Sequence, residues 1–303
     1  MRFGICIPQF VEDGTFEPAA LQGYLARAEE LGFESAWTVE QVLGTIPSLE
    51  PLQTLAYAAA ATTTIRLGCA VLITTLHSPV HLAKTISTLD QLSRGRVEVG
   101  VGTGGRRTFP AFGVDPATFV ARFTEGIELM KALWTQPEVK FDGRFWQLDG
   151  AAMEPKPVQK PHPPVWFGGS APAALRRAVR HGDGFFGAGS QTTEQFAAQV
   201  PIVREALEEQ GRSDFPIAKR VYLAVDDDPG RARSRLSDAL QRMYNVFGAG
   251  DLTPVTVFGP PDACIEGLNA VAAAGAEMIL LNPLFDEADQ MERLAAEVMP
   301  HIA

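Results

Sequence analysis

The chain has 303 residues, of which 46% are hydrophobic and 20% are charged, a composition typical of a globular protein and not of a disordered one. Its formal net charge of -10 argues against nucleic acid or an anionic membrane surface as the main partner. No apolar run approaches the roughly 20 residues that cross a bilayer, and residues 1–10 do not resemble a signal peptide, so we expect a cytoplasmic protein.

Short β-branched runs alternate with amphipathic helical patterns along the whole chain. The strand candidates are nearly continuous apolar runs, as expected for parallel strands covered on both faces. They are Phe3–Pro8, Ser35–Val39, Arg66–Ile73, Val97–Val101, Pro164–Phe167, Gly184–Phe186, Ile217–Val225 and Met278–Leu281. This alternation favours a closed (β/α)8 barrel over an open doubly wound sheet, formed as a single domain over residues 1–303.

Helix candidates between these strands have recognisable ends. An apolar stripe ends at Gly32, and Ser78 with Pro79 begins a helix that runs to Gly95. Two further helices are predicted over Pro260–Gly275 and Asp286–Pro300. The core-facing positions of the first two helices are Leu21, Leu25, Ala28 and Leu31, then Leu82, Ile86, Leu89 and Leu92.

The segment Gln136–His162 interrupts the alternation and predicts an insertion near residues 136–163. Asp142-Gly143 signals a hairpin turn, and a proline-rich stretch runs from Pro155 to Pro164. Two interpretations stay open: a cover over the barrel mouth, or a peripheral loop with no role in binding. In the first, the aromatic residues Phe141, Phe145 and Trp146 indicate an apolar or planar substrate.

The three cysteines, Cys6, Cys69 and Cys264, are far apart, with no CxxC spacing and no nearby pair of histidines. We expect them to be small buried side chains in a reducing compartment, and we expect no metal site.

Functional groups of such a barrel lie where strands end, on its C-terminal face. The strand-end positions are Pro8, Gln9, Glu40, Gln41, Thr74, Thr75, His77, Gly102–Gly105, Gly168–Ser170, Gly187–Gly189 and Asn282. This set is poor in nucleophiles and general bases. It therefore favours a cofactor that supplies the reactivity, while the protein supplies binding and orientation.

Two glycine clusters follow strands. Gly100–Gly105 matches GxGxxG, but Arg106–Pro110 follows it in place of a helix, so we interpret it as a loop that approaches a ligand closely. Gly168-Gly169-Ser170 precedes a helix with Pro172 in its first turn, where Ser170 can cap and exposed amides can bind a phosphate. An ordinary capped turn is the alternative for this second cluster.

Together these motifs resemble the luciferase-like monooxygenase family over essentially the whole chain. The stretches that carry the resemblance are Gly32–Glu40, Ile65–Val71, His77–Pro79, Leu89–Gly102, Pro161–Ser170 and Gly182–Phe185. The resemblance implies a (β/α)8 barrel that binds FMN or the deazaflavin coenzyme F420 in its mouth, and an oxidoreductase activity.

The resemblance also implies positions for the cofactor. A non-proline cis peptide at Ala70-Val71 would form a bulge against the ring system, and the phosphate would lie at Gly168-Gly169-Ser170. Further cofactor contacts are implied for Glu40, Thr103 and Gly104.

The sequence departs from the family pattern at two positions. Gln41 stands where several relatives have a histidine, and Gly105 stands where sugar-phosphate dehydrogenases have a catalytic glutamate. Both departures argue against sugar-phosphate oxidation. Glu40 remains as a catalytic candidate, with acid–base chemistry and cofactor contact both open; His77 is either catalytic or structural, and Trp37 fills the wall or touches substrate.

The choice between the cofactors depends on charge. Coenzyme F420 carries an acidic oligoglutamate tail, and the arginines near the two glycine clusters are Arg106, Arg107, Arg176, Arg177 and Arg180. We take Arg106 and Arg177 as cofactor-binding residues and favour F420 over FMN, although solvated arginines on exposed helix faces are the alternative.

The sequence therefore predicts an F420-dependent oxidoreductase that moves a hydride between the deazaflavin and a small organic molecule. The first alternative is a two-component FMN monooxygenase, which requires oxygen and a partner flavin reductase. The second is a flavin-binding barrel without catalysis. The family resemblance adds a homodimer as an expected assembly.

Overall fold

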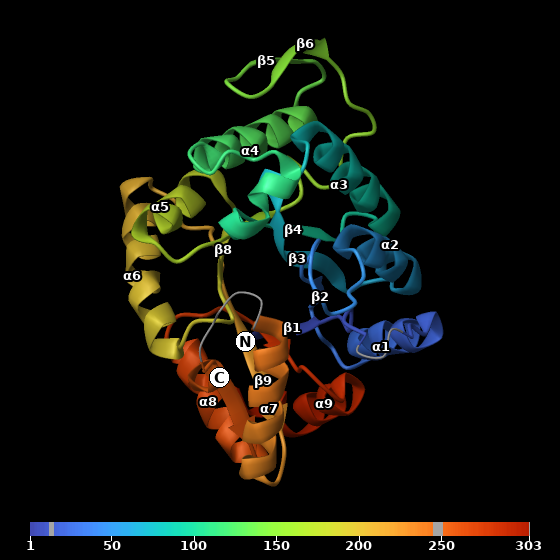
Figure 1. Ribbon diagram of the computed structural model, residues 1–303, viewed down its shortest axis with the longest axis vertical. Helices are drawn as coiled ribbons and strands as arrows, with labels where there is room; N and C mark the ends of the chain where they lie inside the picture. Colours follow the sequence, from blue (N-terminus) through green and yellow to red (C-terminus); the bar gives the residue numbers. More distant parts are fainter. Residues whose placement is uncertain (12–14, 245–250, 303) are drawn as a thin grey trace.

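A computed structural model of the chain describes residues 1–11, 15–244 and 251–302. Eight parallel strands form a closed ring in the order β9-β11-β1-β2-β3-β4-β7-β8, and pairing of β8 with β9 closes it (Figure 1). These strands are β1 (Arg2–Cys6), β2 (Ser35–Thr38), β3 (Arg66–Ile73), β4 (Val97–Gly102), β7 (Val165–Gly168), β8 (Gly184–Gly187), β9 (Ile217–Val225) and β11 (Met278–Asn282). The predicted closed barrel is confirmed.

One strand was not predicted from the sequence. The strand β10 (Thr256–Gly259) pairs with the last four residues of β9, outside the closed ring. Its residues are mostly half-buried. Prolines stand close on both sides of it, so its apolar run is short and was not recognised as a strand. Because β9 is nine residues long, its last four residues are available to pair with β10.

Helices surround the barrel on the outside (Figure 1). They are α1 (Pro18–Glu30), α2 (Pro51–Ala61), α3 (Pro79–Ser93), α4 (Phe119–Thr135), α5 (Pro172–His181), α6 (Thr193–Glu209), α7 (Pro229–Tyr244), α8 (Pro261–Ala273) and α9 (Glu287–Arg293). The predicted apolar face of α3 is buried except at Leu92, which is 64% exposed. Ser93 takes the core position instead, because Leu92 lies about 90° from the middle of that face at 3.6 residues per turn.

The last predicted helix is wrong in one respect. The segment Asp286–Pro300 is not one α-helix: α9 passes into a π-helical turn over Leu294–Val298 and a 3-10 turn over Met299–His301. Pro300 lacks the amide hydrogen that an α-helix would need at that position.

The predicted insertion forms a hairpin of β5 (Val139–Asp142) and β6 (Gln147–Ala151), which lies on the outer side of α4 (Figure 1). Trp146 packs beside Gly126 of α4 and lies under the guanidinium of Arg122 at 4.6 Å. None of residues 136–162 lines the two cavities of the barrel mouth described below. The hairpin is therefore peripheral and does not cover the mouth, and the substrate hint taken from its aromatic residues loses its basis.

Other sequence predictions concern the loops and cysteines. A 3-10 helix over Arg106–Phe112 follows Gly100–Gly105, so this cluster does not begin the helix of a dinucleotide-binding fold. All three cysteines are buried free thiols. In the described part of the chain, no helix is long and apolar enough to cross a membrane.

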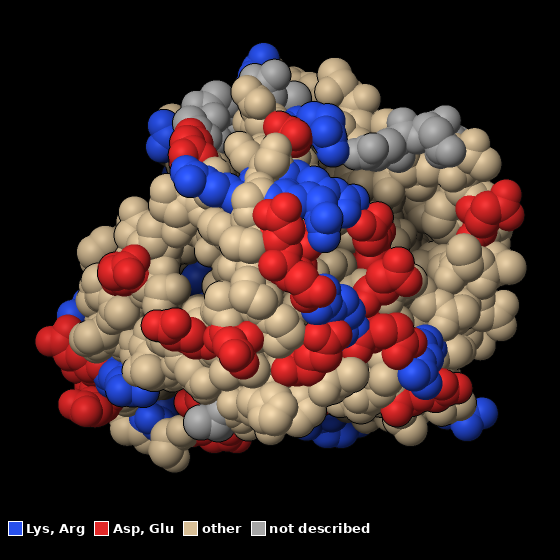
Figure 2. Space-filling view, turned by 90° about the horizontal axis from the view of Figure 1, so that it is seen from below, with Lys and Arg blue, Asp and Glu red and all other residues tan. Residues whose placement is uncertain are grey.

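The barrel interior is filled by aromatic rings below the mouth. Trp37 of β2 packs edge-on against Phe186 at 5.0 Å and against Trp166 at 6.3 Å between ring centroids. Helices outside the barrel are joined by ion pairs such as Arg27–Glu292 and Arg176–Glu205, and Figure 2 shows acidic and basic side chains close together on one face. The surface charge on that face is mixed.

Candidate functional site

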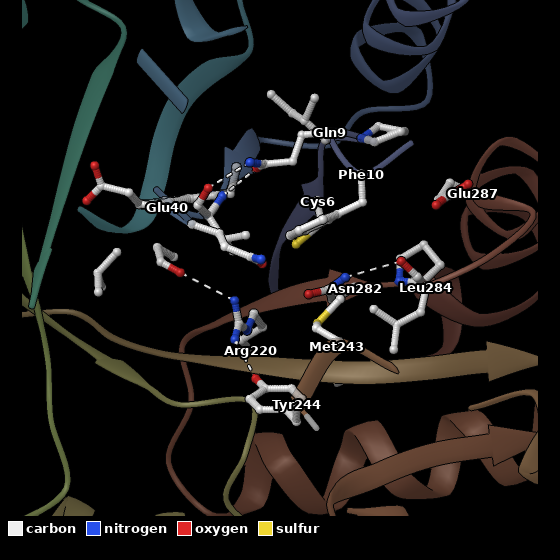
Figure 3. A pocket seen from close by; sticks show the side chains of 18 of the residues that line it. Cys6, Gln9, Phe10, Glu40, Arg220, Met243, Tyr244, Asn282, Leu284 and Glu287 are labelled. Carbon is white, nitrogen blue, oxygen red and sulfur yellow. Dashed lines mark hydrogen bonds between the residues drawn. The ribbon is translucent and has the colours of Figure 1, made fainter. Parts of the chain in front are cut away.

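Two adjoining cavities open at the C-terminal ends of the barrel strands. The larger, of about 310 Å³, is lined by residues at the ends of β1, β2, β3 and β11, by Arg220 of β9 and by the end of α7 (Figure 3). The smaller, of about 240 Å³, extends towards the ends of β4, β7 and β8. Ala70, Val71, Gly104 and Arg220 line both cavities, so the two form one continuous site.

A backbone bulge in β3 lies where the two cavities join. The Ala70-Val71 peptide is cis, as the family resemblance predicted, and the pairing of β3 with β4 shifts register between Cys69 and Leu72. Gly100 of β4 makes room for the bulge, because a Cβ at Gly100 would lie 2.0 Å from the carbonyl oxygen of Cys69. The bulge brings Val71 to the wall of the site.

Glu40 connects the end of β2 to the end of β3. One carboxylate oxygen accepts a hydrogen bond from the amide of Ile73, and the other lies 2.7 Å from Nε2 of His77. The Glu40 side chain is only 1% exposed and lines the larger cavity, whereas His77 lines neither cavity. The structure thus brings the two catalytic candidates together and places Glu40 nearer to the site.

The charge of His77 depends on this contact. Burial opposes protonation of the imidazole, but the hydrogen bond to Glu40 and the negative charge of Glu40 together raise the pKa of His77 above its ordinary value of 6.5. Both oxygens of Glu40 are occupied in this arrangement. The two contacts of Glu40 are suited to holding the end of β3 beside the bulge.

The second glycine cluster lies at the far end of the smaller cavity. Gly168 and Gly169 line this cavity just before α5, with Thr103 and Gly104 across from them. The predicted cap is wrong: Ala171 occupies the N-cap position, and no side chain caps α5. Within the described residues, the amides of Gly169 and Ser170 donate to no protein acceptor, so they are available to an anion at this helix start.

The arginines near the glycine clusters differ in their contacts. Arg106 is exposed, and its guanidinium lies 4.9 Å from the ring centroid of Phe119. Arg176 is paired with Glu205 and Glu209 of α6, each at 2.8 Å, so this arginine is not available for a cofactor tail. Arg177 is half-buried and forms no ion pair with any residue that the structure describes.

Sequence reasoning missed Arg220, which lies in the middle of β9 and lines both cavities (Figure 3). Its guanidinium donates to the carbonyl oxygen of Ala70 at 3.3 Å and to the hydroxyls of Tyr222 at 2.7 Å and Tyr244 at 3.3 Å. A signal was present in the sequence, because Lys219 and Arg220 are adjacent charges in an otherwise apolar strand, and enclosed charges are expensive unless a partner or a function keeps them.

The neighbouring Lys219 is bonded to backbone carbonyl groups and has a structural role. Its ammonium group donates to the carbonyl oxygens of Ala188, Gln191 and Arg220, at 2.5, 2.9 and 3.1 Å. These contacts hold the loop after β8 against the strand that carries Arg220. The loop in turn forms part of the smaller cavity through Gly187 and Ala188.

The chain is similar to known proteins in sequence and in fold. The family model of luciferase-like monooxygenases matches residues 1–255. The F420-dependent glucose-6-phosphate dehydrogenase of Kineococcus radiotolerans is 32% identical over 230 residues, covering 72% of this chain and 67% of that protein. The solved structure of the monooxygenase RslO1 from Streptomyces bottropensis is 26% identical and superimposes over 100% of both chains with a TM-score of 0.86.

A further solved structure shares the fold. It is the FMN complex of the oxygenating constituent of 3,6-diketocamphane monooxygenase from Pseudomonas putida. It superimposes with a TM-score of 0.82 over 100% of this chain and 99% of that chain, at 18% identity. At that identity the likeness concerns the barrel alone.

Proposed function

The chain belongs to the luciferase-like monooxygenase family, whose members are F420- or FMN-dependent oxidoreductases, and we propose that this one uses coenzyme F420 to transfer a hydride to or from an organic substrate. The observation that carries the proposal is the continuous two-part site. A mostly apolar cavity against the Val71 bulge leads into a glycine-lined cavity that reaches Gly168 and Gly169, and the amides of Gly169 and the adjacent Ser170 donate to no acceptor among the described residues. This shape fits a planar ring with a phosphorylated side chain.

The residues present fit such a cofactor chemically. The cavity walls at Val71, Gly102 and Gly104 leave space on the side of β4, where a Cβ at Gly102 would lie 2.6 Å from Val71 Cγ2. The helix start at Gly169-Ser170 offers amides and a favourable dipole to the phosphate without requiring a lysine. When bound, the cofactor supplies the hydride chemistry.

The preference for F420 over FMN rests on charge beyond the phosphate. Arg177 on α5 is half-buried and has no acidic partner among the described residues, and Arg106 is exposed after the first glycine loop. An acidic oligoglutamate tail would complement these two cations, whereas FMN ends at its phosphate. The similarity to an F420-dependent relative supports the same choice.

The protein groups around the ring have distinct tasks in this proposal. Trp37, Val71 and Leu284 exclude water from the reacting face, which strengthens polar interactions within the site. Glu40 holds the end of β3 in place, because both of its oxygens are already bonded. Gly105 lines the larger cavity and carries no side chain, so it supplies no carboxylate at the position where the family resemblance implies the catalytic glutamate of sugar-phosphate dehydrogenases.

Spectral titration of the apoprotein with F420 and with FMN, side by side, tests the proposal. We expect F420 to bind at micromolar concentration or tighter, and Arg177→Ala to weaken F420 binding by about tenfold, equivalent to about 1.4 kcal/mol, without weakening FMN. Arg176→Ala is the matched control on the same helix, since Arg176 is already paired with Glu205 and Glu209. Tight FMN binding without F420 binding would overturn the proposal.

The FMN-dependent monooxygenase is the second candidate, favoured by the overall similarity to RslO1. It requires a partner reductase to supply reduced FMN. Oxygen consumption that depends on reduced FMN would identify it. Cofactor that binds but turns over neither with hydride donors nor with oxygen would identify a non-catalytic binding protein.

A further inference from the structure

Arg220 is a cation inside the barrel that faces the site. It is the fourth residue of β9 and pairs in register with Leu280 of β11. Its side chain lies where the two cavities meet, with Tyr244 at the end of α7 beside it (Figure 3). Any molecule that enters the larger cavity and extends towards the bulge passes this guanidinium.

A second arginine shows what a purely structural buried guanidinium looks like in this protein. Arg96 is 9% exposed and makes five hydrogen bonds to protein oxygens. These acceptors match the five N–H groups of the side chain, so Arg96 has no donor left for a ligand. Neither cavity of the mouth is lined by Arg96.

Arg220 is bonded less completely. Its three protein acceptors are the carbonyl oxygen of Ala70 and the hydroxyls of Tyr222 and Tyr244. Two of its five N–H groups, including the one on Nε, have no acceptor among the described residues. Gly189 leaves Nε uncovered, because a Cβ at that position would lie only 2.8 Å from it.

Arg220 also has no negative partner. In the described part of the chain, no carboxylate lies within 4 Å of its guanidinium, and Glu40 across the cavity is bonded to Ile73 and His77. Burial raises the pKa of Tyr222 well above 10 and the pKa of Cys6 to about 12, so both neighbours are neutral near pH 7. An enclosed charge without a counterion is costly, and a bound anion would offset that cost.

We propose that Arg220 binds an anionic oxygen of the substrate, in the simplest case a carboxylate, and that the substrate is an otherwise apolar molecule. The surrounding walls support the apolar part: Ile7, Phe10, Trp37, Val71 and Leu284 line the same cavity. Tyr222 and Tyr244 both bond Nη2 and fix the orientation of the guanidinium, while Nε–H and one N–H of Nη1 have no acceptor among the described residues. The assignment of this ligand to the redox reaction rests on the proposed function; the binding itself does not.

The test uses the full-length apoprotein and calorimetric titration with two matched pairs of probes, hexanoate against hexanamide and benzoate against benzamide. We expect each carboxylate to bind the wild-type protein at least tenfold more tightly than its amide. Arg220→Met should abolish that preference, and Arg220→Lys should retain part of it. Arg176→Met removes a paired arginine on α5 that lines neither cavity, and it should leave the preference unchanged.

Several outcomes would overturn the proposal. Equal binding of acid and amide by the wild-type protein would do so, as would undetectable binding of all probes at millimolar concentration, or an unchanged preference in Arg220→Met. F420 and FMN titrations of Arg220→Met form a separate arm: loss of cofactor binding with a retained carboxylate preference would assign Arg220 to the cofactor. Because the probe titrations need no cofactor, their result is distinguishable from failure of the F420 proposal.

Discussion

An arginine at the base of the barrel and an arginine at its mouth differ in their partners. At the base, Arg66 of β3 donates to Glu98 of β4, and the other oxygen of Glu98 accepts from Nε1 of Trp166 at 2.5 Å. Arg66 also donates to Gln159 at 2.9 Å. At the mouth, Arg220 faces a cavity without any carboxylate beside it among the described residues. Barrels of this kind place stability at the base and chemistry at the mouth, and the partners of Arg66 and Arg220 agree with that division.

Side-chain packing also differs between the interior of the barrel and its mouth. The aromatic rings of Trp37, Trp166 and Phe186 fill the interior of the barrel. Towards the mouth, glycines stand at the ends of β4, β7 and β8, and their missing side chains leave the smaller cavity open. Substitutions at the two ends should therefore affect different properties, which the following predictions test.

The largest expected effect is at the base. Glu98→Ala removes the partner of a partly buried guanidinium and of the Trp166 indole, and we expect the free energy of unfolding to fall by about 3 kcal/mol, as for a broken buried pair. Glu34→Ala, which breaks the exposed Arg2–Glu34 pair, should cost less than about 1 kcal/mol. Urea unfolding measures both, and equal losses would contradict the distinction.

Cofactor affinity gives a second test of whether Glu98 acts on stability alone. F420 or FMN affinity of folded Glu98→Ala should stay within about threefold of the wild-type value, since Glu98 lines neither cavity of the mouth. A loss of affinity that exceeds the loss from mouth substitutions would show that the base takes part in the site.

The next effect contrasts two adjacent glycines at the mouth. Gly104 has φ +66, and a Cβ there would lie 2.3 Å from Ile73 Cγ2, so we expect Gly104→Ala to cost about 2 kcal/mol of unfolding free energy and to weaken cofactor binding. Gly105 has φ -88 and open space at its Cβ position, so Gly105→Ala should change stability by less than about 0.5 kcal/mol. Reversal of this order in urea unfolding would be inconsistent with the loop geometry described.

Glu40→Gln should have an intermediate effect. The amide side chain keeps its shape and can still accept from the Ile73 amide, but it loses the charge that attracts His77. We expect a loss of about 1 kcal/mol in unfolding free energy, together with cofactor affinity weakened several-fold. If Glu40 transfers a proton instead of positioning β3, turnover with hydride donors would fall far more than affinity does.

The smallest effect is a pH dependence at His77. Its folded-state pKa is raised above 6.5, so the stabilisation from its contact with Glu40 is fully present below about pH 6.5 and is lost as pH rises through the folded-state pKa. The wild-type protein should exceed His77→Gln by about 0.5–1 kcal/mol near pH 6 and by less near pH 9. Unfolding free energies at both pH values check this, and a difference that grows with pH would contradict it.

Most of the fold could be predicted because its signals are local. Continuous apolar runs gave the eight barrel strands, and the prolines and glycines between them marked the helix ends. The short strand β10 and the broken helix after Arg293 were missed, since four residues with a single strand partner, or a turn near Pro300, carry too weak a pattern. The family resemblance located the Ala70-Val71 cis peptide, which periodicity alone does not indicate.

For the candidate site, the sequence predicted several residues at strand ends and missed one within a strand. The strand-end rule found Glu40, Gly104, Gly168 and Gly169, which line the cavities of the mouth. It missed Arg220, because Arg220 stands in the middle of a strand and reaches the mouth through the length of its side chain. Sequence reasoning also left open a cover of the mouth by the hairpin and counted Arg176 among the basic residues near the glycine clusters, although neither lines a cavity of the mouth.

The sequence by itself determined the alternation of elements, the closed parallel barrel and the glycines at its rim, because periodicity and turn chemistry act over a few neighbouring residues. The tertiary structure decided which charges are satisfied. Arg220 bonds to Ala70, 150 positions earlier in the chain, and Arg66 bonds to Glu98, 32 positions later. Such partners are set by closure of the barrel, and a charge left without one becomes visible only when every neighbour in space is known.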